Sequence, residues 1–219
     1  MRRTTWPIPT QSPTCTGHDL LMAALERIEG ANPRGGKIIF LGDYVDRGPD
    51  SAQVLETLMR GPDDAGRWTW VCLKGNHEDM MVSTLGGPDE EWWLGNGGVA
   101  TVASFGGVIP EEYLAWCRAL PTWHEDAQRV YVHAAVDPSK ALNEQSEAML
   151  MWTRYGEEYN AGYRGKHVVH GHTPHKDGPV LFSERTNLDT GAVFTGRLVV
   201  GVFDDEIPGG PRSLIEVAA

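Results

Sequence analysis

The sequence predicts one layered α/β domain over residues 1–219, and three observations support this fold class. Short apolar segments typical of buried strands occur between helices that have one apolar face. Four of these segments end directly at clusters of Asp, Asn, His or Arg, where open α/β sheets carry their functional loops. Apolar residues make up 41% and charged residues 22% of the chain, which provides enough material for a core.

The predicted elements follow one another along the whole chain. The first helix covers residues 19–29, where apolar side chains recur on one face before Gly30 ends the pattern. A second helix covers residues 51–60 and is closed by a Gly-Pro pair. Strands are predicted over residues 37–41, 68–73, 129–134 and 166–174. From about Thr186 onwards, the tail is predicted to form β-hairpins with glycine turns.

Charge and cysteine content limit the classes of partner. The formal net charge of -11 argues against nucleic acid and anionic membranes, because both are bound by basic surfaces. A small phosphate-bearing substrate is compatible with this charge, since a local cluster of cations can override it. The three cysteines are few and odd in number, and no apolar run suits a signal peptide or a membrane span. These features predict a cytoplasmic protein.

The segment GDYVDRG at residues 42–48 is the first candidate for chemistry. Asp43 and Asp46 lie three positions apart in a tight glycine-bounded loop, where a carboxylate can bridge two hard cations. An isolated Asp-x-x-Asp is more often a turn in which one carboxylate caps a helix and pairs with a residue such as Arg47. The other segments decide between these readings.

Three more segments place polar side chains after strands. GNHED supplies the amide oxygen of Asn76 and the imidazole of His77, which titrates near neutral pH. YVHAA supplies His133, although a single histidine at a strand end is more often structural. HGHTP supplies His170 and His172. We expect His172, in the loop, to bind a metal, and His170 to pack or to support it.

Taken together, these segments predict a metal site at the strand ends. Its ligands are expected to be Asp43, Asn76, His133 and His172. Oxygen and imidazole ligands without a thiolate suit manganese, iron or zinc in a functional site rather than a structural zinc site. Arg47 and Arg154 add two guanidinium groups that can each form paired hydrogen bonds to a phosphate. A metal, arginines and a titratable histidine together predict phosphoester hydrolysis.

The same segments resemble a known family. GDYVDRGPDS, LKGNHED, VHA, WTR, HGHTP and NLDTGA occur in the order found in the phosphoprotein phosphatase branch of the calcineurin-like metallophosphoesterases, and most resemble its bacterial and phage-type serine/threonine phosphatases. The likeness covers residues 19–202, and the combination of GDxVDRG with GNHE is highly specific. It implies a fold of two packed mixed β-sheets with helices outside.

The resemblance also implies roles for the candidate residues. Asp43 would bridge two divalent metals, for which manganese is the leading candidate, and the other three ligands would complete the second metal site. A hydroxide held between the metals would attack phosphorus in line. Arg47 and Arg154 would bind the phosphoryl oxygens. His77, oriented by Asp46, would protonate the leaving alkoxide.

The first motif of that family, Asp-x-His-Gly, is missing. Its spacing places it at residues 13–16, where the sequence reads Pro-Thr-Cys-Thr, and a thiolate at Cys15 replaces a histidine poorly beside a hard metal. The strand expected before it contains two prolines, which suit a central strand poorly. With one site lost, the chain is expected to bind one metal well and to hydrolyse phosphoesters poorly.

Two explanations would lessen the importance of this atypical segment, residues 1–17. His18 and Asp19 could replace the missing ligands, although Asp19 is more simply a helix cap. Alternatively, residues 12–17 are a frameshifted copy of the motif, since codons can be chosen for them that read Asp-Met-His-Gly in another frame. The gene sequence tests this second explanation directly.

Substrate choice rests on the resemblance and on one further segment. Residues 87–107 are predicted to form a cap over the site, in which Trp92 and Trp93 either stack on a substrate or anchor the cap to the core. A phosphorylated protein is the leading substrate, and a small phosphoester is the alternative. Dinucleoside polyphosphate hydrolysis is the rival activity, although relatives of that kind typically differ at the position of Asp46. A non-catalytic protein that binds metal and phosphate is the third possibility.

Overall fold

The computed structural model describes residues 4–8, 17–156 and 158–218 of the chain. Its helices are α1 (Gly17–Ala31), α2 (Ser51–Arg60), α3 (Asn76–Thr84), α4 (Glu90–Trp93), η1 (Leu94–Gly98), α5 (Val99–Ser104), α6 (Glu111–Ala119), η2 (Leu142–Glu144), α7 (Glu147–Trp152) and α8 (Ala192–Thr195). Its strands are β1 (Thr4–Ile8), β2 (Gly36–Phe40), β3 (Trp68–Cys72), β4 (Trp123–Glu125), β5 (Arg129–Val132), β6 (His167–His170), β7 (Val180–Leu181), β8 (Arg185–Asn187), β9 (Arg197–Asp204) and β10 (Ser213–Ala218).

The strands form two mixed sheets. The first has the order β10-β9-β1-β2-β3, in which β1, β2 and β3 are parallel and the last two strands of the chain are antiparallel additions. The second has the order β4-β5-β6-β8-β7, with a parallel centre of β5, β6 and β8 and an antiparallel strand at each edge. In both sheets, parallel neighbours end at a common edge, so their following loops lie close together.

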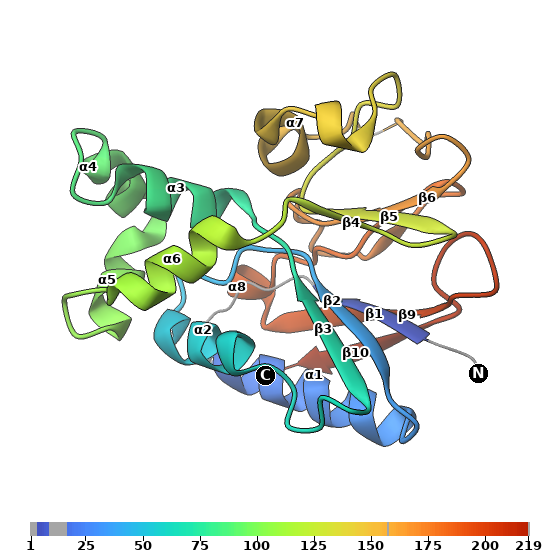
Figure 1. The fold of residues 1–219 in the computed structure, drawn as a ribbon, viewed down its shortest axis with the longest axis horizontal. Coiled ribbons are helices and arrows are strands. Elements are labelled where there is room, and N and C mark those ends of the chain that lie inside the picture. Colours follow the sequence, from blue (N-terminus) through green and yellow to red (C-terminus); the bar gives the residue numbers. More distant parts are fainter. Residues whose placement is uncertain (1–3, 9–16, 157, 219) are drawn as a thin grey trace.

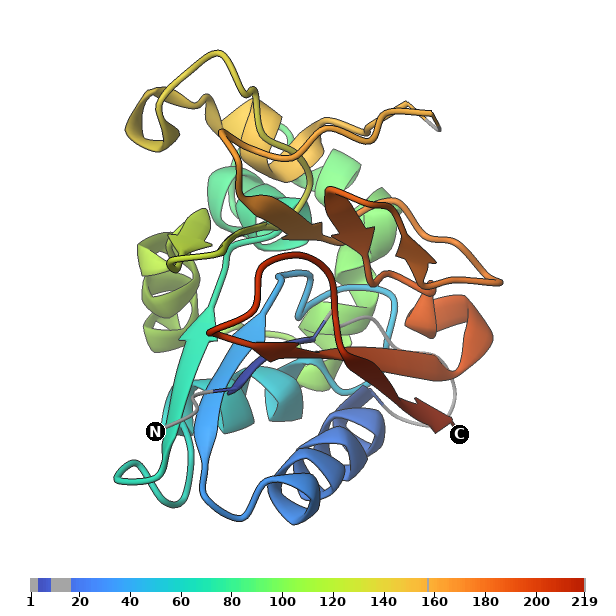
Figure 2. The same cartoon turned by 90° about the vertical axis from the view of Figure 1, so that its right-hand side faces the viewer.

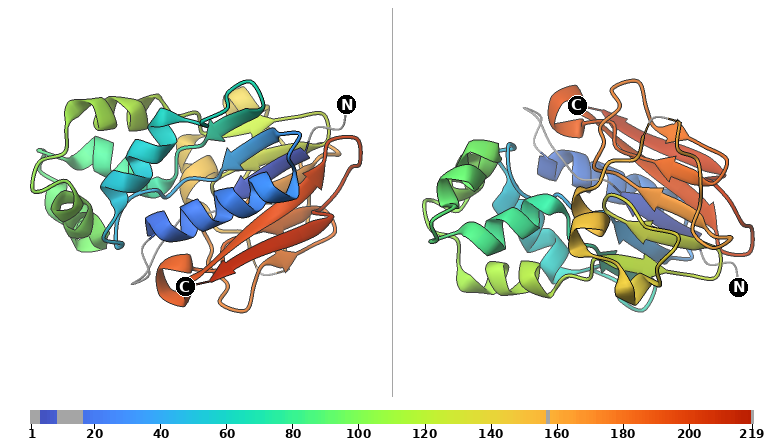
Figure 3. Two further views of the ribbon diagram at one scale, coloured as in Figure 1. Left: turned by 90° about the horizontal axis from the view of Figure 1, so that it is seen from below. Right: turned by 90° about the horizontal axis from the view of Figure 1, so that it is seen from above.

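The two sheets pack face to face, with helices on their outer sides (Figures 1 and 2). Helices α1 and α2 cover the outer face of the first sheet, and α7 covers the second, while α3–α6 gather beside the sheets (Figures 1 and 3). Side chains alternate accordingly along the strands. In β2, Ile38 and Phe40 belong to the core under the helices, whereas Ile39 belongs to the core between the sheets together with Tyr131 and Val169. The predicted fold of two packed mixed sheets flanked by helices is therefore confirmed.

Most predicted elements agree with the structure, and two differ. The tail does not form a hairpin immediately after Thr186: β8 lies in the second sheet and β9 in the first, because the short helix α8 carries the chain between them. The antiparallel hairpin forms instead between β9 and β10. The glycines at 191 and 196 flank α8 in the left-handed conformation, so they bound a helix rather than a hairpin turn.

The proline-containing segment at the N-terminus is a strand after all. Strand β1 lies inside the first sheet and pairs with β2 along Thr5–Ile8, although its prolines were expected to suit a central strand poorly. Its pairing with β9 involves only Thr4 and Thr5. The part that carries Pro7 therefore has a neighbouring strand on one side, which is where a sheet tolerates proline. Within the described residues, no helix is both long and apolar enough to cross a membrane.

Candidate active site

Four loops meet at the ends of the parallel strands. Asp43 follows β2, and Asn76 begins α3 shortly after β3, the parallel neighbour of β2. His133 directly follows β5, and His172 lies two residues beyond β6, the parallel neighbour of β5. Strands β5 and β6 end earlier than predicted, so both histidines lie in loops. Each sheet thus contributes two side chains to one place, in keeping with the position of ligand sites at strand carboxyl ends.

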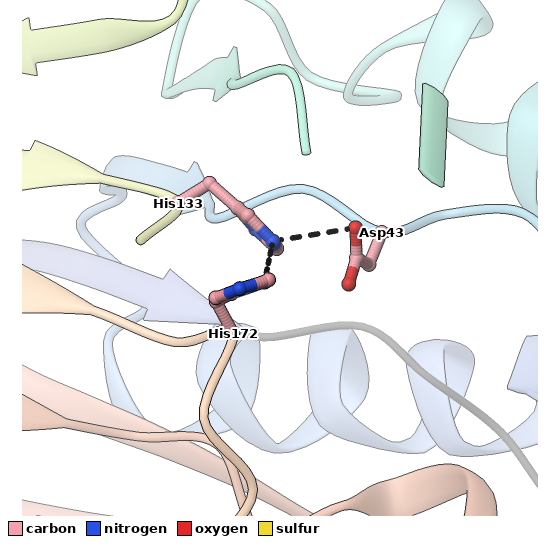
Figure 4. A group of neighbouring side chains, drawn as sticks. All are labelled: Asp43, His133 and His172. Carbon is pink, nitrogen blue, oxygen red and sulfur yellow. Dashed lines mark hydrogen bonds and ion pairs between the residues drawn. The ribbon is translucent and has the colours of Figure 1, made fainter. Parts of the chain in front are cut away.

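Three of the four predicted metal ligands, Asp43, His133 and His172, point at one another (Figure 4), and the amide oxygen of Asn76 lies 2.9 Å from both rings. His133 Nε2 lies 2.9 Å from Asn76 Oδ1, 3.2 Å from His172 Nδ1 and 3.4 Å from an oxygen of Asp43. His172 Nδ1 lies 2.9 Å from Asn76 Oδ1. Among the described residues, Asp43, His133 and His172 form the one group of three or more acidic, histidine or cysteine side chains close enough to hold a metal ion.

The opposite ring nitrogens determine what this group can bind. His133 Nδ1 donates to the backbone oxygen of Leu41 at 2.7 Å, and His172 Nε2 donates to that of Trp152 at 3.1 Å. Because carbonyl oxygens only accept, each neutral ring is left with a lone pair on the nitrogen that faces the group. These two lone pairs converge with oxygens of Asp43 and Asn76, which repel one another unless a cation lies between them. The residues therefore fit a divalent metal ion.

Charges around the group favour the ligand form of its members. Burial raises the pKa of Asp43, but the nearby histidines His133, His77 and His172 outweigh it and lower the pKa below its usual range. Burial, together with the charge of His133, lowers the pKa of His172 to about 4. At neutral pH, an ionised carboxylate therefore faces a neutral imidazole, as metal binding requires.

Sequence reasoning did not identify Glu78, which holds this group together. Its fully buried carboxylate accepts hydrogen bonds from the backbone N–H groups of Asp43 at 2.8 Å, Tyr44 at 2.5 Å, Val45 at 3.2 Å and Gly75 at 2.9 Å. Burial and the charge of Asp43 raise the pKa of Glu78 to about 7, against these donors. The last letter of GNHE was the available signal: a glutamate at the third position of a helix can reach back to preceding N–H groups.

The backbone of the site is unusual. Five described residues other than glycine have a positive φ, and four of them are the predicted site residues Asp43, Asp46, Arg47 and His172. Such conformations are costly and persist where surrounding contacts enforce them, often at functional sites. Gly42 also has a positive φ of 97°, and a Cβ there would meet the backbone of Gly75 at 2.6 Å. The close approach of the two loops therefore requires glycine.

A second pair lies beside the ligand group. His77 Nδ1 lies 2.6 Å from a carboxylate oxygen of Asp46, and both side chains are buried. Burial lowers the pKa of His77, but the charge of Asp43 and the hydrogen bond and charge of Asp46 outweigh it and raise the pKa above its usual value. The structure thus brings together an imidazole that can carry a proton and a carboxylate that orients it.

The two predicted arginines are exposed, and His170 is buried away from the ligand group. Arg47 is exposed, with its guanidinium 5.9 Å from the ring centre of Phe194. Arg154 is also exposed, and its charge contributes to the lowered pKa of His172. His170 lies apart from the ligand group: it is buried and accepts a hydrogen bond from Arg185 at 2.9 Å. This is the structural position that we expected for His170.

The position of the missing motif, residues 13–16, lies outside the described residues, as does Cys15. Gly17 begins α1 and lines the same pocket as Asp43 and Asp46, so the chain enters α1 next to these carboxylates. His18 does not point into the ligand group, because its Nε2 lies 3.1 Å from the hydroxyl of Thr57 on α2. The structure therefore gives no support to His18 as a replacement ligand.

Comparisons with known proteins identify the family of this chain. The model of the calcineurin-like phosphoesterase family matches residues 15–200. "Serine/threonine-protein phosphatase 1" of Salmonella typhimurium is 28% identical over 180 residues, which are 77% of this chain and 79% of that protein. The asymmetrical bis(5'-nucleosyl)-tetraphosphatase of Anoxybacillus flavithermus is 28% identical over 190 residues, which are 76% of this chain and 75% of that protein.

Solved structures show the same fold. A metallophosphoesterase from Sphaerobacter thermophilus superposes with a TM-score of 0.60 at 17% identity, over 98% of this chain and 88% of the other. A cold-active protein-tyrosine phosphatase of a psychrophilic Shewanella superposes with a TM-score of 0.62 at 16% identity, over 90% of this chain and 75% of the other. Because the family model covers most of the chain, the protein belongs to the calcineurin-like phosphoesterase family and is a metal-dependent phosphoesterase.

Proposed function

We propose that this chain is a phosphomonoesterase of the serine/threonine phosphoprotein phosphatase type. The observation that carries the proposal is the 2.6 Å contact between His77 and Asp46 beside the four-residue ligand group. A hydrolase that cleaves a phosphate from an alcohol must protonate a poor leaving group, and this pair is suited to do so. A relative named as a serine/threonine-protein phosphatase, at 28% identity, supports the same choice.

Each predicted residue has a role in this proposal. Asp43, Asn76, His133 and His172 hold a divalent metal ion, for which manganese is the first choice and iron or zinc the alternatives. The bound ion would supply Lewis acidity for the attack of water on phosphorus. Arg47 and Arg154 bind the phosphoryl oxygens and offset the charge that develops on them. His77 donates its Nε2 proton to the leaving oxygen, while Asp46 holds the ring through Nδ1.

The proposal includes a limit on the activity of the chain. The first metal motif is missing from the sequence, so we expect one metal ion per chain and slow hydrolysis. Manganese stoichiometry on protein of confirmed intact mass tests this expectation. One ion, lost on Asp43→Ala, supports a single site, whereas two ions would mean that another group completes the first site.

Dinucleoside polyphosphate hydrolysis is the second candidate. One relative named as a bis(5'-nucleosyl)-tetraphosphatase matches this chain at the same 28% identity, and others match at 26%. Trp92 is 51% exposed and stacks on Trp152, with ring centres 5.9 Å apart and an angle of 22° between the rings. A half-exposed aromatic surface next to a phosphate site suits a nucleobase. Polyphosphate hydrolases of this family typically differ at the position of Asp46, so the aspartate in this chain favours phosphatase activity.

One comparison of products separates the candidates. Manganese-loaded protein is incubated with a phosphoserine peptide and, separately, with diadenosine tetraphosphate. Release of inorganic phosphate from the peptide supports the proposed function, and release of mononucleotides without it supports the second candidate. Protein that hydrolyses neither, yet binds the peptide more weakly after Arg154→Ala, would be a non-catalytic phosphate-binding relative, and the proposed function would be wrong.

A further inference from the structure

The segment predicted to cap the site contacts Asp46, the residue that orients His77. Helices α4, η1 and α5 follow one another along residues 90–104. Helix α4 lies beside α3, which begins with Asn76 and His77 (Figure 1), and α5 contacts α2. Trp93 at the end of α4 and Thr101 in α5 are both fully buried. Both side chains contact the carboxylate of Asp46.

These contacts fix the orientation of the Asp46 carboxylate. The indole N–H of Trp93 donates to its two oxygens at 3.0 and 3.1 Å. The hydroxyl of Thr101 donates to Oδ1 at 2.8 Å, which leaves Oδ2 turned towards His77 Nδ1. A carboxylate held by donors on both oxygens cannot rotate without losing a hydrogen bond inside a buried site.

The same segment also holds the backbone of the Asp46 loop. The N–H of Asp46 donates to the Thr101 hydroxyl at 2.7 Å, and the N–H of Arg47 donates to the backbone oxygen of Gly97 at 3.1 Å. Asp46 and Arg47 both have a positive φ, so these bonds stabilise a strained stretch. A Cβ on Gly97 would meet the backbone nitrogen of Arg47 at 2.8 Å, which explains a glycine at this position.

We propose that Trp93 and Thr101 are positioning residues for His77: they hold the Asp46 carboxylate so that the imidazole keeps its Nδ1 proton and directs Nε2 at the leaving group. This inference rests on the proposed function for its catalytic consequence, but not for the positioning itself. A segment that only anchored itself to the core would need no donors on this particular carboxylate. Trp93 is buried and donates to Asp46, whereas its neighbour Trp92 is exposed.

Conservative changes test the proposal in the whole 219-residue chain. Trp93→Phe removes the indole N–H and keeps most of the ring, and Thr101→Val removes the hydroxyl. Thr101→Ser restores the hydroxyl and serves as the rescue. Trp68→Phe is the matched control, because Trp68 is equally buried and its indole N–H has no partner among the described residues. Thermal unfolding of each variant reports the purely structural cost.

The first measurement is the NMR signal of the His77 Nδ1 proton in protein with nitrogen-15 histidine, assigned by its loss in His77→Asn. A proton held by a buried carboxylate exchanges slowly and is visible. We expect it to weaken or vanish in Trp93→Phe and Thr101→Val, and to persist in Thr101→Ser and Trp68→Phe. An unchanged signal in both test variants, or no signal in the wild type, would overturn the proposal.

The second measurement compares two esters. The phenolate of p-nitrophenyl phosphate leaves without a proton, whereas the alkoxide of a phosphoserine peptide needs one. Trp93→Phe should lower kcat for the peptide about tenfold more than kcat for the aryl ester. An equal loss on both esters would contradict positioning. Wild-type protein that hydrolyses neither ester contradicts the proposed function alone, and the NMR signal still decides this inference.

Discussion

The ligand group and the Asp46–His77 pair lie side by side, yet their hydrogen bonding differs. In the ligand group, two ring nitrogens with lone pairs converge with oxygens of Asp43 and Asn76. In the pair, the carboxylate of Asp46 receives an imidazole, an indole and a hydroxyl donor. The first group needs a cation from outside the chain, whereas the second is complete within it.

This difference predicts which part of the site depends on the metal concentration in solution. Converging acceptors are stabilised only when a metal ion is bound between them, so the stability that this group contributes should rise with metal concentration. A carboxylate satisfied by internal donors should keep its geometry with or without metal. Substitutions in the ligand group should therefore change metal affinity, and substitutions in the pair should change the catalytic rate.

The largest expected effect comes from breaking the pair. His77→Asn keeps a donor for Asp46 but removes the group that can protonate a leaving alkoxide. We expect kcat for a phosphoserine peptide to fall roughly 10³-fold below the wild type, within the range for general acid catalysis. Manganese affinity, measured by calorimetry, should stay unchanged. A variant that lost metal and activity together would mean that the two groups are not separable.

The second prediction concerns the ligand group, where removing a ligand should weaken manganese binding. Asp43→Ala removes the carboxylate that faces His133, and manganese affinity should fall by more than about 100-fold, since even outer partners of metal ligands contribute about 10–100-fold. The manganese-induced rise in Tm should vanish with it. Asp89→Asn, at an exposed position of the α4 region, is the control and should bind manganese like the wild type. Equal affinity in both variants would contradict the assigned site.

A histidine outside both groups should make the stability of the fold depend on pH. His167 is buried on β6, with Nε2 2.8 Å from the hydroxyl of Thr186, and burial, followed by the charge of Arg129, lowers its pKa to about 4. Its pKa when unfolded is near 6.5, so between pH 6.5 and 4 the unfolded chain binds the extra proton. Stability is therefore full above pH 6.5 and falls as the pH drops towards 4, by about 3 kcal/mol from this residue.

Denaturant unfolding of the wild type and of His167→Gln across this pH range measures that contribution. The variant should lose less stability than the wild type as the pH falls. The difference between the two proteins should be the same with manganese and with a chelator, because His167 belongs to neither group. Parallel pH profiles of the wild type and the variant would refute the assignment.

The smallest expected effect concerns the residue that supports the ligand group. Glu78→Gln keeps the shape of the side chain but offers one acceptor oxygen where the carboxylate offers two, so some of its four N–H donors lose their partner. We expect a loss of about 2 kcal/mol in unfolding free energy and weaker manganese binding. Glu91→Gln, which is exposed, should change neither quantity. Full stability in Glu78→Gln would show that its bonds are dispensable.

The spacing of apolar residues predicted much of the fold. Helix α2 begins and ends at the predicted residues, and α1 extends the predicted helix by two residues at each end. Apolar spacing suffices there, because each helix buries one face against a sheet. The tail was misread because alternation cannot tell a hairpin within one sheet from two strands in different sheets. Pro7 was misread because strand pairing on each side is a tertiary property.

The residue types along the chain define the chemistry available to the site: a carboxylate, an amide and two imidazoles after strands, with an Asp and a His nearby. Their types and spacing are local facts, and parallel strands bring such loops to one edge. The way in which these side chains are held depends on contacts between distant parts of the fold. Glu78, Trp93 and Thr101 act through hydrogen bonds across 3 to 55 positions of the chain. The position of Glu78 in GNHE is a local signal for its contact to Gly75, whereas the folded backbone alone brings Trp93 and Thr101 to Asp46.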